Sequence, residues 1–537
     1  MKTSEMETVN CTINGTSVEV SKGTRIIEAA EHAGIGIAHY CYHAGLSAPA
    51  MCRMCLVEVE GAPKLVPACV TTVGPDQVIH TESEKAREAR RGTLEFYLAN
   101  HPLDCPICDK SGECRLQDFV HAEGRKHGRS IEPKRVLGQD DFGGDILYDG
   151  DRCIMCTRCV RFTREISQSS ALDVVQRGSR SVIDTFFDHG TEGDPFAGNV
   201  VDICPVGALL SKDFLHKARV WDLDHTPSVC TSCSQGCNIR IDSRDNLVAR
   251  LKPRTNPDVN SWWMCDYGRL RYEWMNAPDR LDQPLVHTDA AQLVPVTWKA
   301  AALDLVDRLG AADSPGVVLI GSPFLSNEDN GLLLQVAKAL GETDAIYRSP
   351  RTDDEVVCPG FPKLARRRDL AANGRGLDAL GFRRVGNDTA TGGLPDVAGR
   401  ILIVAGDPLA DAPADYGADA LVFVALAHHR TPALAAASMV LPITTHAESD
   451  GTFTNFEGRV QRFWPALDAP AGARPAWQVA GVLLAGLGAG QAPPDAGRAF
   501  LMLARLNDGF EHLSYEVIGT HGELLRVPAL IDTADGD

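Results

Sequence analysis

The chain is 537 residues long, which predicts several domains, and its apolar fraction of 44% allows ordinary hydrophobic cores. Its formal net charge of -18 argues against nucleic acid as a partner, because phosphate binding requires a basic face. Of its 17 cysteines only Cys358 lies beyond residue 265, and a chain of this length with Cys-x-x-Cys groups more often binds metal than forms a disulfide scaffold.

No segment is expected to cross a membrane. The sequence contains no run of about 18 apolar residues, and its best candidate, Val479–Gly488, is short and rich in glycine. The first residues, Met1–Glu7, lack an apolar signal segment. These features predict a soluble cytoplasmic protein that attaches to a membrane, if at all, through a partner and without direct membrane insertion.

The first expected elements form a β-hairpin. Val9–Ile13 and Thr16–Val20 flank Asn14-Gly15, a dipeptide that strongly favours a two-residue turn. Cys11 lies in the first of these strands and is interpreted as a small core residue.

A helix and a further strand are expected next. Thr24 is predicted to cap a helix with apolar residues on one face, and Gly34 to end it. Leu56–Glu60 alternates apolar and polar residues as a strand does. Strands, a helix and a cysteine-bearing loop near the sheet predict a β-grasp domain of the ferredoxin kind.

Helices and buried strands are expected beyond residue 80. Ser83 is predicted to cap a helix over Glu84–Asn100, whose C-terminal end delivers His101. Four short apolar runs lie later between helical stretches, a pattern typical of strands buried in parallel α/β sheets. These runs are Val317–Ile320, Ile401–Ala405, Ala420–Ala425 and Met439–Leu441.

Almost all cysteines up to residue 265 fall into four groups, which His101 completes to four sites of four ligands each. The groups are Cys41, Cys52, Cys55 and Cys69; His101, Cys105, Cys108 and Cys114; Cys153, Cys156, Cys159 and Cys204; and Cys230, Cys233, Cys237 and Cys265. Only Cys11 and Cys358 are left over.

The third group has the most specific spacing. Cys153, Cys156 and Cys159 follow the Cys-x2-Cys-x2-Cys pattern of bacterial ferredoxins, whose next cysteine precedes a proline. Thr163 occupies that fourth position here, and the remote Cys204-Pro205 is expected to supply the missing ligand. The spacing favours a [4Fe–4S] cluster over zinc.

The first group has a plant-ferredoxin pattern with one departure. Plant-type [2Fe–2S] ferredoxins use Cys-x4-Cys-x2-Cys with a distant fourth cysteine, whereas ten residues separate Cys41 from Cys52. Small residues such as Gly45 permit backbone N–H groups to approach the sulfurs. A structural zinc knuckle is the alternative. Three nearby histidines are interpreted as ordinary polar or packing residues, namely His32, His39 and His43.

The second and fourth groups are less specific by themselves. A histidine with three cysteines suits a tetrahedral zinc ion as well as iron, and the fourth group also fits a zinc site. The position of the second group between two ferredoxin-like groups favours a [4Fe–4S] cluster. Replacing a thiolate with the imidazole of His101 makes such a cluster less negative, which tends to raise its potential.

The order of these groups resembles the family of large iron–sulfur subunits in the peripheral arm of proton-pumping NADH–quinone oxidoreductase, the respiratory complex I. Residues 441–461, which begin Leu-Pro-Ile-Thr-Thr-His-Ala-Glu-Ser-Asp-Gly, and residues 321–330 resemble further signatures of that family. The likeness covers residues 8–485 and is strongest over residues 41–265.

The resemblance implies one [2Fe–2S] cluster on the first group and [4Fe–4S] clusters on the other three, with the fourth present only in some family members and off the main electron route. All sixteen residues then bind iron, and none is catalytic. Five domains are implied: 1–80 [2Fe–2S] ferredoxin-like, 81–122 with one histidine and three cysteine ligands, 123–220 ferredoxin-like [4Fe–4S], 221–280 with four cysteine ligands, and 281–537 molybdopterin-oxidoreductase-like.

The α/β region after Cys265 resembles molybdopterin-dependent formate dehydrogenases, whose fold complex I subunits share without the molybdenum. Active relatives carry a lysine two residues after the last cluster cysteine, where this chain has Tyr267. The candidate metal ligand Cys358 is followed by Pro359 and not by histidine. The region is interpreted as a truncated scaffold without molybdopterin.

The expected function is electron transfer as a subunit of NADH:quinone oxidoreductase, from an FMN/NADH subunit through iron–sulfur clusters towards quinone. The sequence has no Walker A motif and no Gly-x-Gly-x-x-Gly after a strand, and no NADH or quinone site is recognised. Expected partners are the FMN/NADH-binding subunit, the small [2Fe–2S] subunit, and the iron–sulfur and quinone-module subunits of the peripheral arm, at the cytoplasmic side of the inner membrane.

Three alternatives stay open. The chain could belong to a molybdenum or tungsten formate dehydrogenase with Cys358 at the metal. It could be the electron-transfer subunit of an NAD-linked hydrogenase, although such a subunit would normally end near residue 240. It could also be a zinc-rich assembly scaffold without redox function.

Overall fold

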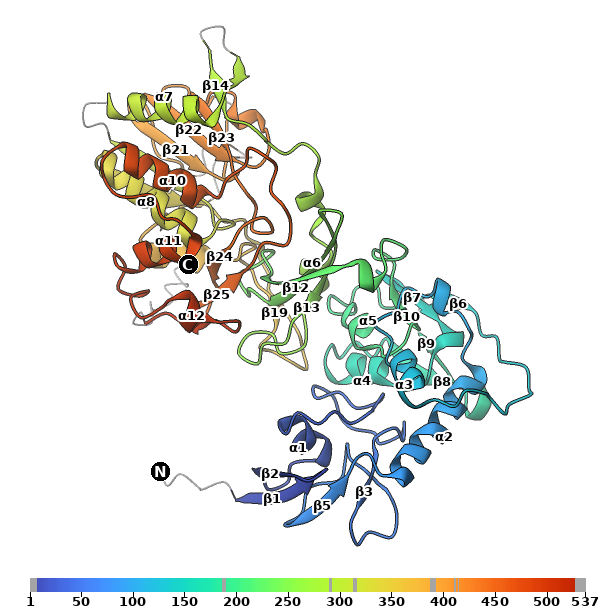
Figure 1. The fold of residues 1–537 in the computed structure, drawn as a ribbon. Coiled ribbons are helices and arrows are strands. Elements are labelled where there is room, and N and C mark those ends of the chain that lie inside the picture. The colour runs from blue at the N-terminus through green and yellow to red at the C-terminus, as the bar shows by residue number, and fades with distance from the viewer. Residues whose placement is uncertain are drawn as a thin grey trace. The chain divides into compact units, whose positions relative to one another are not determined.

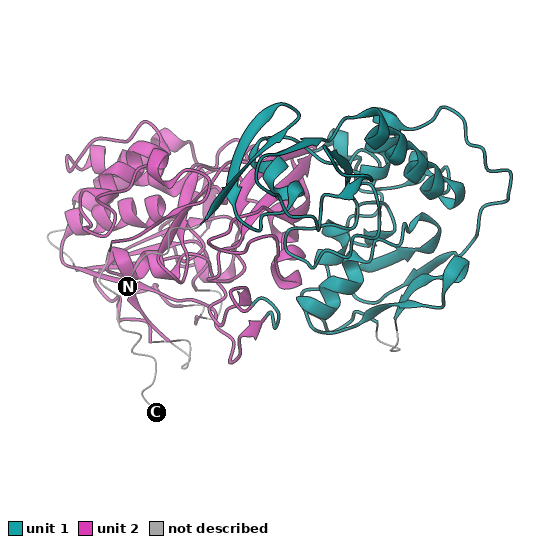
Figure 2. Ribbon diagram, turned by 90° about the horizontal axis from the view of Figure 1, so that it is seen from below, with its two compact units in different colours: residues 1–223, 358–361 teal, residues 224–357, 362–537 magenta. Residues whose placement is uncertain are grey.

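The computed structural model describes residues 7–185, 190–288, 292–311, 316–386, 393–409, 412–413 and 415–526. The ends of the predicted outer domains, residues 1–6 and 527–537, lie outside the described residues. The chain forms two compact units, one of residues 1–223 with 358–361 and one of residues 224–357 with 362–537 (Figure 2). Their elements are labelled in Figure 1, and the described parts confirm the predicted mixture of α+β and α/β domains.

Unit 1 begins with a five-stranded mixed sheet in the order β2-β1-β5-β3-β4. Its strands are β1 (Thr8–Ile13), β2 (Thr16–Ser21), β3 (Leu56–Val59), β4 (Val66–Pro67) and β5 (Gln77–His80). Strands β1 and β2 are antiparallel, and β1 pairs in parallel with β5. The predicted hairpin is confirmed, because Asn14 (φ 48°) and Gly15 (φ 85°) both adopt the left-handed conformation that a type I′ turn requires. Cys11 is buried in this core, as expected.

Helix α1 (Ile26–His32) starts one residue later than its predicted cap implies. Arg25 and not Thr24 is the N-cap, and the Thr24 hydroxyl instead donates to the Ser21 carbonyl (2.7 Å). The N-terminal contact comes from Glu28, whose carboxylate accepts the backbone N–H of Arg25 (3.0 Å). Gly34, in the left-handed conformation (φ 71°), ends the helix as predicted.

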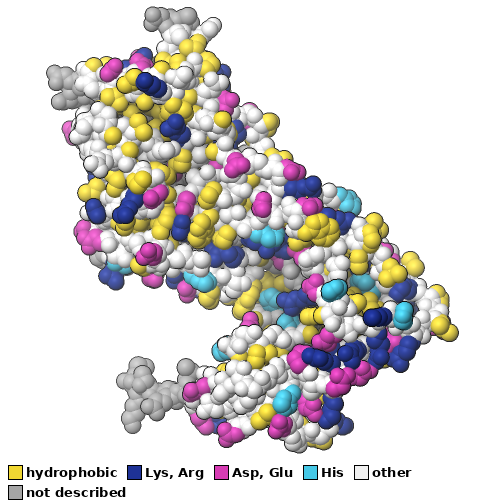
Figure 3. Space-filling model, viewed as in Figure 1, with side chains coloured by type: hydrophobic (Ala, Val, Ile, Leu, Met, Phe, Trp, Pro, Cys, Tyr) yellow, Lys and Arg dark blue, Asp and Glu magenta, His cyan; other side chains and the backbone are white. Residues whose placement is uncertain are grey.

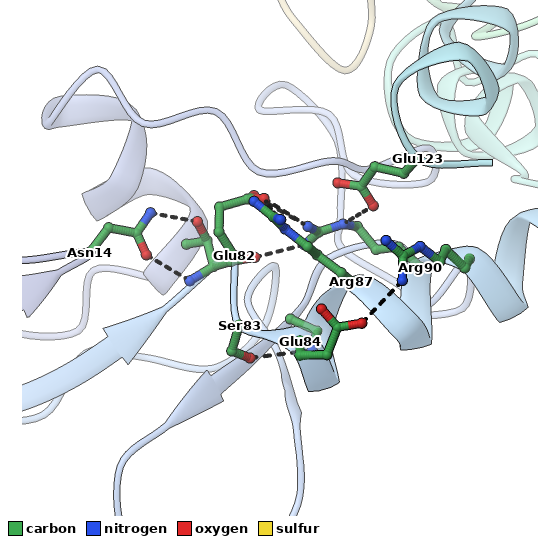
Figure 4. Close-up of polar contacts among 10 residues, drawn as sticks. Asn14, Glu82, Ser83, Glu84, Arg87, Arg90 and Glu123 are labelled. Carbon is green, nitrogen blue, oxygen red and sulfur yellow. Dashed lines mark hydrogen bonds and ion pairs between the residues drawn. The ribbon is translucent and has the colours of Figure 1, made fainter. Parts of the chain in front are cut away.

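Helix α2 (Glu84–Asn100) begins at the predicted cap, where the Ser83 side chain accepts the N–H of Ala86, and ends at His101. Arg90, on its buried face, donates to the Thr81 carbonyl (2.7 Å) and to Glu123 at the end of α3 (Arg115–Glu123; 2.6 Å) (Figure 4). The remaining guanidinium nitrogen of Arg90, Nη2, donates to Glu82 (3.2 Å). One buried guanidinium thus joins α2, α3 and the end of the first sheet.

The rest of unit 1 is built from short elements. Strands β6 (Gln139–Asp141), β7 (Ile146–Asp149) and β10 (Leu209–Ser211) form one sheet, and β8 (Leu172–Val175) and β9 (Val182–Thr185) form another. The helices are α4 (Arg158–Glu165) and α5 (Asn199–Ile203). Short 3-10 turns cover Cys105–Ile107, Gly150–Arg152, Gly178–Arg180 and Val220–Asp222.

Unit 2 begins with a three-stranded antiparallel sheet of β11 (Asp224–Val229), β12 (Asn238–Arg244) and β13 (Leu247–Pro253), followed by α6 (Asp266–Arg269). A 3-10 turn at Glu273–Asn276 precedes the large sheet. This segment carries the fourth cysteine group.

The large sheet of unit 2 has eight strands in the order β15-β14-β23-β22-β21-β16-β17-β20. They are β14 (Leu285–His287), β15 (Leu293–Pro295), β16 (Val317–Gly321), β17 (Thr343–Tyr347), β20 (Arg383–Arg384), β21 (Ile401–Ala405), β22 (Val422–Ala427) and β23 (Met439–Pro442). All four predicted apolar runs are strands that pair in parallel with one another. Only the Ala420–Ala425 run is displaced, since its strand covers 422–427.

Helices and small sheets surround this core. The helices are α7 (Trp298–Gly310), α8 (Asn327–Leu340), α9 (Gly374–Leu380), α10 (Ala476–Gly486), α11 (Ala496–Ala504) and α12 (Tyr515–Ile518). The small strands are β18 (Val356–Val357), β19 (Ala365–Arg366), β24 (Gly451–Thr454), β25 (Arg459–Phe463) and β26 (Glu523–Leu524), and a 3-10 turn covers Pro432–Leu434.

On the face seen in Figure 3, acidic and basic side chains are interspersed with apolar ones. Within the described ranges, no helix has both the length and the apolar character that a membrane crossing needs.

Candidate metal centres

The four thiols of the third group line a single small cavity. Cys153 and Cys156 come from the loop before α4, Cys159 from α4 itself, and Cys204 from the C-terminal cap of α5. The remaining walls are largely apolar side chains, including Ile154, Ile183 and Val206. Burial raises the pKa of Cys156 to about 12, because the thiolate is poorly solvated there. A cationic group bound at the four sulfurs would supply the stabilisation that solvent does not.

Two left-handed residues shape the loop around Cys156. Met155 (φ 54°) and Thr157 (φ 56°) lie on either side of it, although neither is a glycine. The Met155 N–H donates to the Cys153 sulfur (3.4 Å). Left-handed residues of this kind occur in nests, where successive backbone N–H groups point into one concavity and attract an anion such as a thiolate.

The position of the fourth ferredoxin cysteine lies in α4 and is filled by a buried threonine. Thr163 stands at the position where bacterial ferredoxins have their fourth cysteine, and its side chain is fully buried. Its hydroxyl donates to the Val160 carbonyl (3.1 Å), so the helix itself satisfies it.

In the first group, Cys41, Cys52 and Cys55 lie in the loop between α1 and β3, and Cys69 follows β4. All four cysteines are buried. Hydrogen bonds from Cys52 and Cys69 lower the pKa of Cys41, so the thiols lie close enough to share protons. The Tyr40 N–H also donates to the Cys52 sulfur (3.5 Å). Ala50 (φ 53°) and Arg53 (φ 60°) are left-handed on either side of Cys52, as Met155 and Thr157 are around Cys156.

Two histidines beside the first group already have partners. The ring of His39 contacts the Ile37 carbonyl (2.7 Å) and accepts from Arg115 (2.8 Å), and burial lowers its pKa to about 4. His43 accepts the Gly45 N–H (3.1 Å), and burial lowers its pKa to about 3. Both rings act as neutral polar groups, and His32 is an exposed residue at the end of α1.

The second group combines buried and exposed ligands. Cys108 and Cys114 are buried, and burial raises the pKa of both thiols, whereas Cys105 is exposed. His101 Nδ1 is buried, yet finds no hydrogen-bond partner among the described residues. Such an orphaned nitrogen is costly unless a ligand uses it. A metal at His101 would satisfy the imidazole.

A glycine keeps space open beside the second group. A Cβ on Gly207 would lie 2.2 Å from the Cys108 sulfur and 3.2 Å from the Cβ of Lys110. Gly207 follows Cys204-Pro205 of the third group, so the two groups approach each other here. The negative charge of Cys204 also raises the pKa of the Cys114 thiol.

The fourth group lies in unit 2 and is buried throughout. Cys230 directly follows β11, Cys237 precedes β12, and Cys265 caps α6. A Cβ on Gly268 would lie 2.7 Å from the Cys230 sulfur and 3.9 Å from that of Cys265. Burial raises the pKa of Cys233 to about 12, and the charge of Cys230 adds to the effect.

The third group borders a cavity. Across the ranges that the structure describes, no three His, Cys, Asp or Glu side chains are arranged around one common metal ion. Iron–sulfur clusters are held by cysteine thiolates and by occasional histidine, which is the donor set found here.

Cys358 and Tyr267, the two positions compared with molybdopterin enzymes, have partners within the protein. The buried Cys358 thiol donates to the Ile166 carbonyl (3.4 Å) at the end of α4 within unit 1, and burial raises its pKa to about 12. Tyr267, in unit 2, accepts a hydrogen bond from Arg271, whose guanidinium stacks 4.2 Å from its ring.

Five family models match the chain in succession. They are "2Fe-2S iron-sulfur cluster binding domain" over residues 6–84, "NADH-ubiquinone oxidoreductase-G iron-sulfur binding region" over 90–129, "NADH-quinone oxidoreductase subunit 3, ferredoxin-like domain" over 143–210, "NADH-ubiquinone oxidoreductase NDSU1/NuoG-like, 4Fe-4S domain" over 223–273, and "Molybdopterin oxidoreductase" over 409–485. Domains that bind [2Fe–2S] and [4Fe–4S] clusters are therefore present.

Curated relatives match more than half of the chain. The G subunit of the NADH-quinone oxidoreductase of Rickettsia bellii is 38% identical over 333 residues, which are 62% of this chain and 48% of that protein. The mitochondrial NADH dehydrogenase [ubiquinone] iron-sulfur protein 1 of Solanum tuberosum is 43% identical over 289 residues, 54% of this chain and 39% of that protein. The matched region spans about half the length of the first of these relatives.

Among solved structures, a chain of an NAD+-reducing [NiFe]-hydrogenase in the H2-reduced state is 30% identical, with a TM-score of 0.36. The match covers 40% of this chain and 91% of that one.

Proposed function

Because the chain is a homologue of the G subunit of NADH-quinone oxidoreductase, we propose that it transfers electrons within a proton-pumping NADH-quinone oxidoreductase. It would receive them from a partner with NADH and FMN and pass them towards quinone. The proposal extends to the whole protein an activity that the similarity supports for its iron–sulfur region.

The observation that carries the proposal is the contact between three ligand groups inside unit 1. The Arg161 guanidinium donates both to the Cys41 carbonyl (2.6 Å) and to the Cys156 carbonyl (3.3 Å), so the first and third groups share a neighbour. Gly207, close to Cys204, lies against Cys108 of the second group. The sequence of contacts supports a path from the first group through the third to the second.

Iron–sulfur clusters at these sites would supply one-electron chemistry, and the chain would set their potentials. Its residues bury the sulfurs, exclude water and direct backbone N–H groups at them. The N–H of Tyr40 at Cys52 and that of Met155 at Cys153 are two examples. Such donors stabilise the added negative charge of a reduced group.

We assign one [2Fe–2S] cluster to the first group and one [4Fe–4S] cluster to each of the other three, with all sixteen predicted ligands in these roles. The matched domain families support both cluster types, and the burial of the fourth group supports its occupancy. No molybdopterin is proposed, because Cys358 is occupied by a hydrogen bond to Ile166.

The proposed partners are those of a peripheral arm. They are the FMN/NADH-binding subunit, the small [2Fe–2S] subunit, and the iron–sulfur and quinone-module subunits. The chain would lie at the cytoplasmic side of the inner membrane and be held there by these partners.

The test is anaerobic iron and sulfide analysis of the full chain, combined with EPR. We expect about 14 iron atoms per chain, from one [2Fe–2S] and three [4Fe–4S] clusters. Cys156→Ala should remove one [4Fe–4S] signal and stop transfer from NADH to quinone in the assembled complex. Cys11→Ala is the matched control, because Cys11 is a buried cysteine outside every group. Unchanged transfer in Cys156→Ala would exclude the third group from the main route.

Metal analysis separates the other candidates. Stoichiometric molybdenum or tungsten would favour the formate dehydrogenase alternative, and zinc in place of iron would favour a scaffold. Transfer to NAD from hydrogen in the native complex would favour the hydrogenase alternative.

A further inference from the structure

One face of helix α4 binds the loop of the first ligand group. Arg158, Arg161 and Glu165 are three and four residues apart and therefore share a face. Arg158 donates to the Tyr42 carbonyl, and Arg161 donates to the carbonyls of Cys41 (2.6 Å) and Ser47. Glu165 accepts the N–H of Ser47 (2.9 Å) and its hydroxyl (2.5 Å).

The same two arginines also hold the third group. Arg161 donates to the Cys156 carbonyl (3.3 Å), and Arg158 donates to the Ile203 carbonyl (2.9 Å), directly before Cys204. The two ligand loops are more than a hundred residues apart in sequence, yet they meet at these two guanidinium groups.

Both guanidinium ions are buried without a carboxylate. Arg158 is 4% exposed and Arg161 is 7% exposed. Within the described residues, their hydrogen bonds go to carbonyls and to the Thr157 hydroxyl, and neither forms an ion pair with Asp or Glu. A buried cation without a counter-charge is strongly unfavourable. The negative groups that act on Arg158 would be the Cys156 and Cys204 thiolates.

We propose that Arg158 and Arg161 are positioning residues that fix the spacing between the first and third groups and raise the reduction potentials of both. The proposal rests on the proposed function, because it requires an electron-carrying anionic group at each site. A buried cation between two such groups favours the state with the extra electron, since low polarity strengthens the attraction. The positive charge of one arginine therefore affects electron transfer at both the first and the third group.

The test is an EPR-monitored redox titration of the anaerobically purified full chain. Arg161→Gln keeps a planar hydrogen-bonding side chain and removes the charge. We expect both midpoint potentials to fall, with about a tenfold loss in each reduction equilibrium, which is about 59 mV for a one-electron couple. Arg161→Lys keeps the charge, and its potentials should lie closer to those of the wild type.

Arg164→Gln is the matched control on the same helix. Its side chain is 59% exposed and pairs with Asp173 at the surface, where solvent screens its charge. Both potentials should stay unchanged in this variant.

Equal potentials in the wild type and Arg161→Gln, at equal iron content, would overturn the inference and leave the proposed function intact. A wild-type chain without the two signals would instead overturn the proposed function. If Arg161→Gln loses iron, retention of iron by Arg161→Lys supports a requirement for the charge. Loss of iron in both variants would overturn the inference, because a positive charge retained at this position would then have no effect on the two sites.

Discussion

His101 differs from the predicted cysteine ligands because one of its ring nitrogens is buried without a hydrogen-bond partner among the described residues. Each thiol can remain protonated and neutral when buried, and burial raises the pKa of Cys108 and Cys114 accordingly. The imidazole cannot avoid its cost in this way, because its Nδ1 is buried and unpartnered among the described residues. Burial also lowers the pKa of His101, which keeps the ring neutral and able to coordinate.

His101→Ala should therefore remove one [4Fe–4S] EPR signal and about four iron atoms per chain. Iron analysis and EPR of the purified full chain measure this loss. His121→Ala is the control, because His121 is an exposed residue of α3. Full iron content in His101→Ala would show that the three cysteines hold the group without the imidazole.

Glu328 is a buried carboxyl at the start of α8 in unit 2. Burial raises the pKa of this carboxyl from 4.5 to about 7, although Thr452 and Tyr515 donate hydrogen bonds to it. The folded state thus retains a proton that the unfolded state releases. Its contribution to stability is fully present below pH 4.5 and is lost as the pH rises to about 7.

Glu328→Gln should remove this pH dependence. Between pH 4.5 and 7 the wild type should lose up to about 1.4 kcal/mol per pH unit relative to the variant. Chemical denaturation at several pH values measures the difference. The exposed Glu342→Gln, just beyond the same helix, should follow the wild type. Parallel curves for Glu328→Gln and the wild type would contradict the prediction.

At the scale of elements, helix α2 shows how one buried charge joins separate segments. Arg90 is 2% exposed, and it bonds to Thr81, Glu82 and Glu123. Arg87, one turn away, is 46% exposed and contacts only Glu82 among the charged partners described. The two arginines share a helix and a partner but differ in burial.

Arg90→Met should destabilise unit 1 by about 3 kcal/mol, because it leaves the Thr81 carbonyl and a half-buried carboxylate without their donor. Arg87→Ala should cost less than about 1 kcal/mol, as exposed ion pairs do. Denaturant unfolding of both variants tests the difference. Equal losses would show that burial does not decide the value of these contacts.

Element positions could be predicted where the signal is local. The Asn14-Gly15 turn, the Ser83 cap and the apolar runs of the parallel sheet each depend on residues that are neighbours in sequence. Thr24 failed as a cap because a capping hydroxyl and a turn hydroxyl have the same sequence pattern.

The role of α4 could not be predicted in this way. Arg158 and Arg161 would ordinarily be assigned to a solvated face, yet several of their acceptors lie in a loop more than a hundred residues earlier. The left-handed Met155 and Thr157 also gave no signal, since neither is a residue that favours this conformation. The spacing in the sequence predicts the sixteen candidate ligands, whereas their surroundings depend on the tertiary fold.

At the scale of the whole molecule, most of the candidate ligands lie in loops, whereas Cys105 lies in a 3-10 turn and Cys159 in the first turn of α4. The described strands of the large sheet of unit 2 contain none of them. The third group connects segments that are distant in sequence, since Cys159 and Cys204 both belong to it. Binding to the folded state alone adds stability to it.

Removal of iron with a chelator should therefore loosen the ligand loops first. Amide hydrogen exchange should speed up by at least tenfold, or about 1.4 kcal/mol of local stability, over residues 41–69 and 153–204. Strands β16, β21 and β22 serve as the internal control and should keep their protection. Uniform acceleration across the chain would show that the groups stabilise the fold globally.

Residues 358–361 belong to unit 1, although in the sequence they follow residues 224–357 of unit 2. A ribosome has to synthesise residues 224–357 before the Cys358 thiol and the Gly360 N–H reach the Ile166 carbonyl. Folding of unit 1 during translation therefore stays incomplete until this late tetrapeptide emerges, and a gene fragment that stops at residue 223 encodes a unit that lacks its last piece.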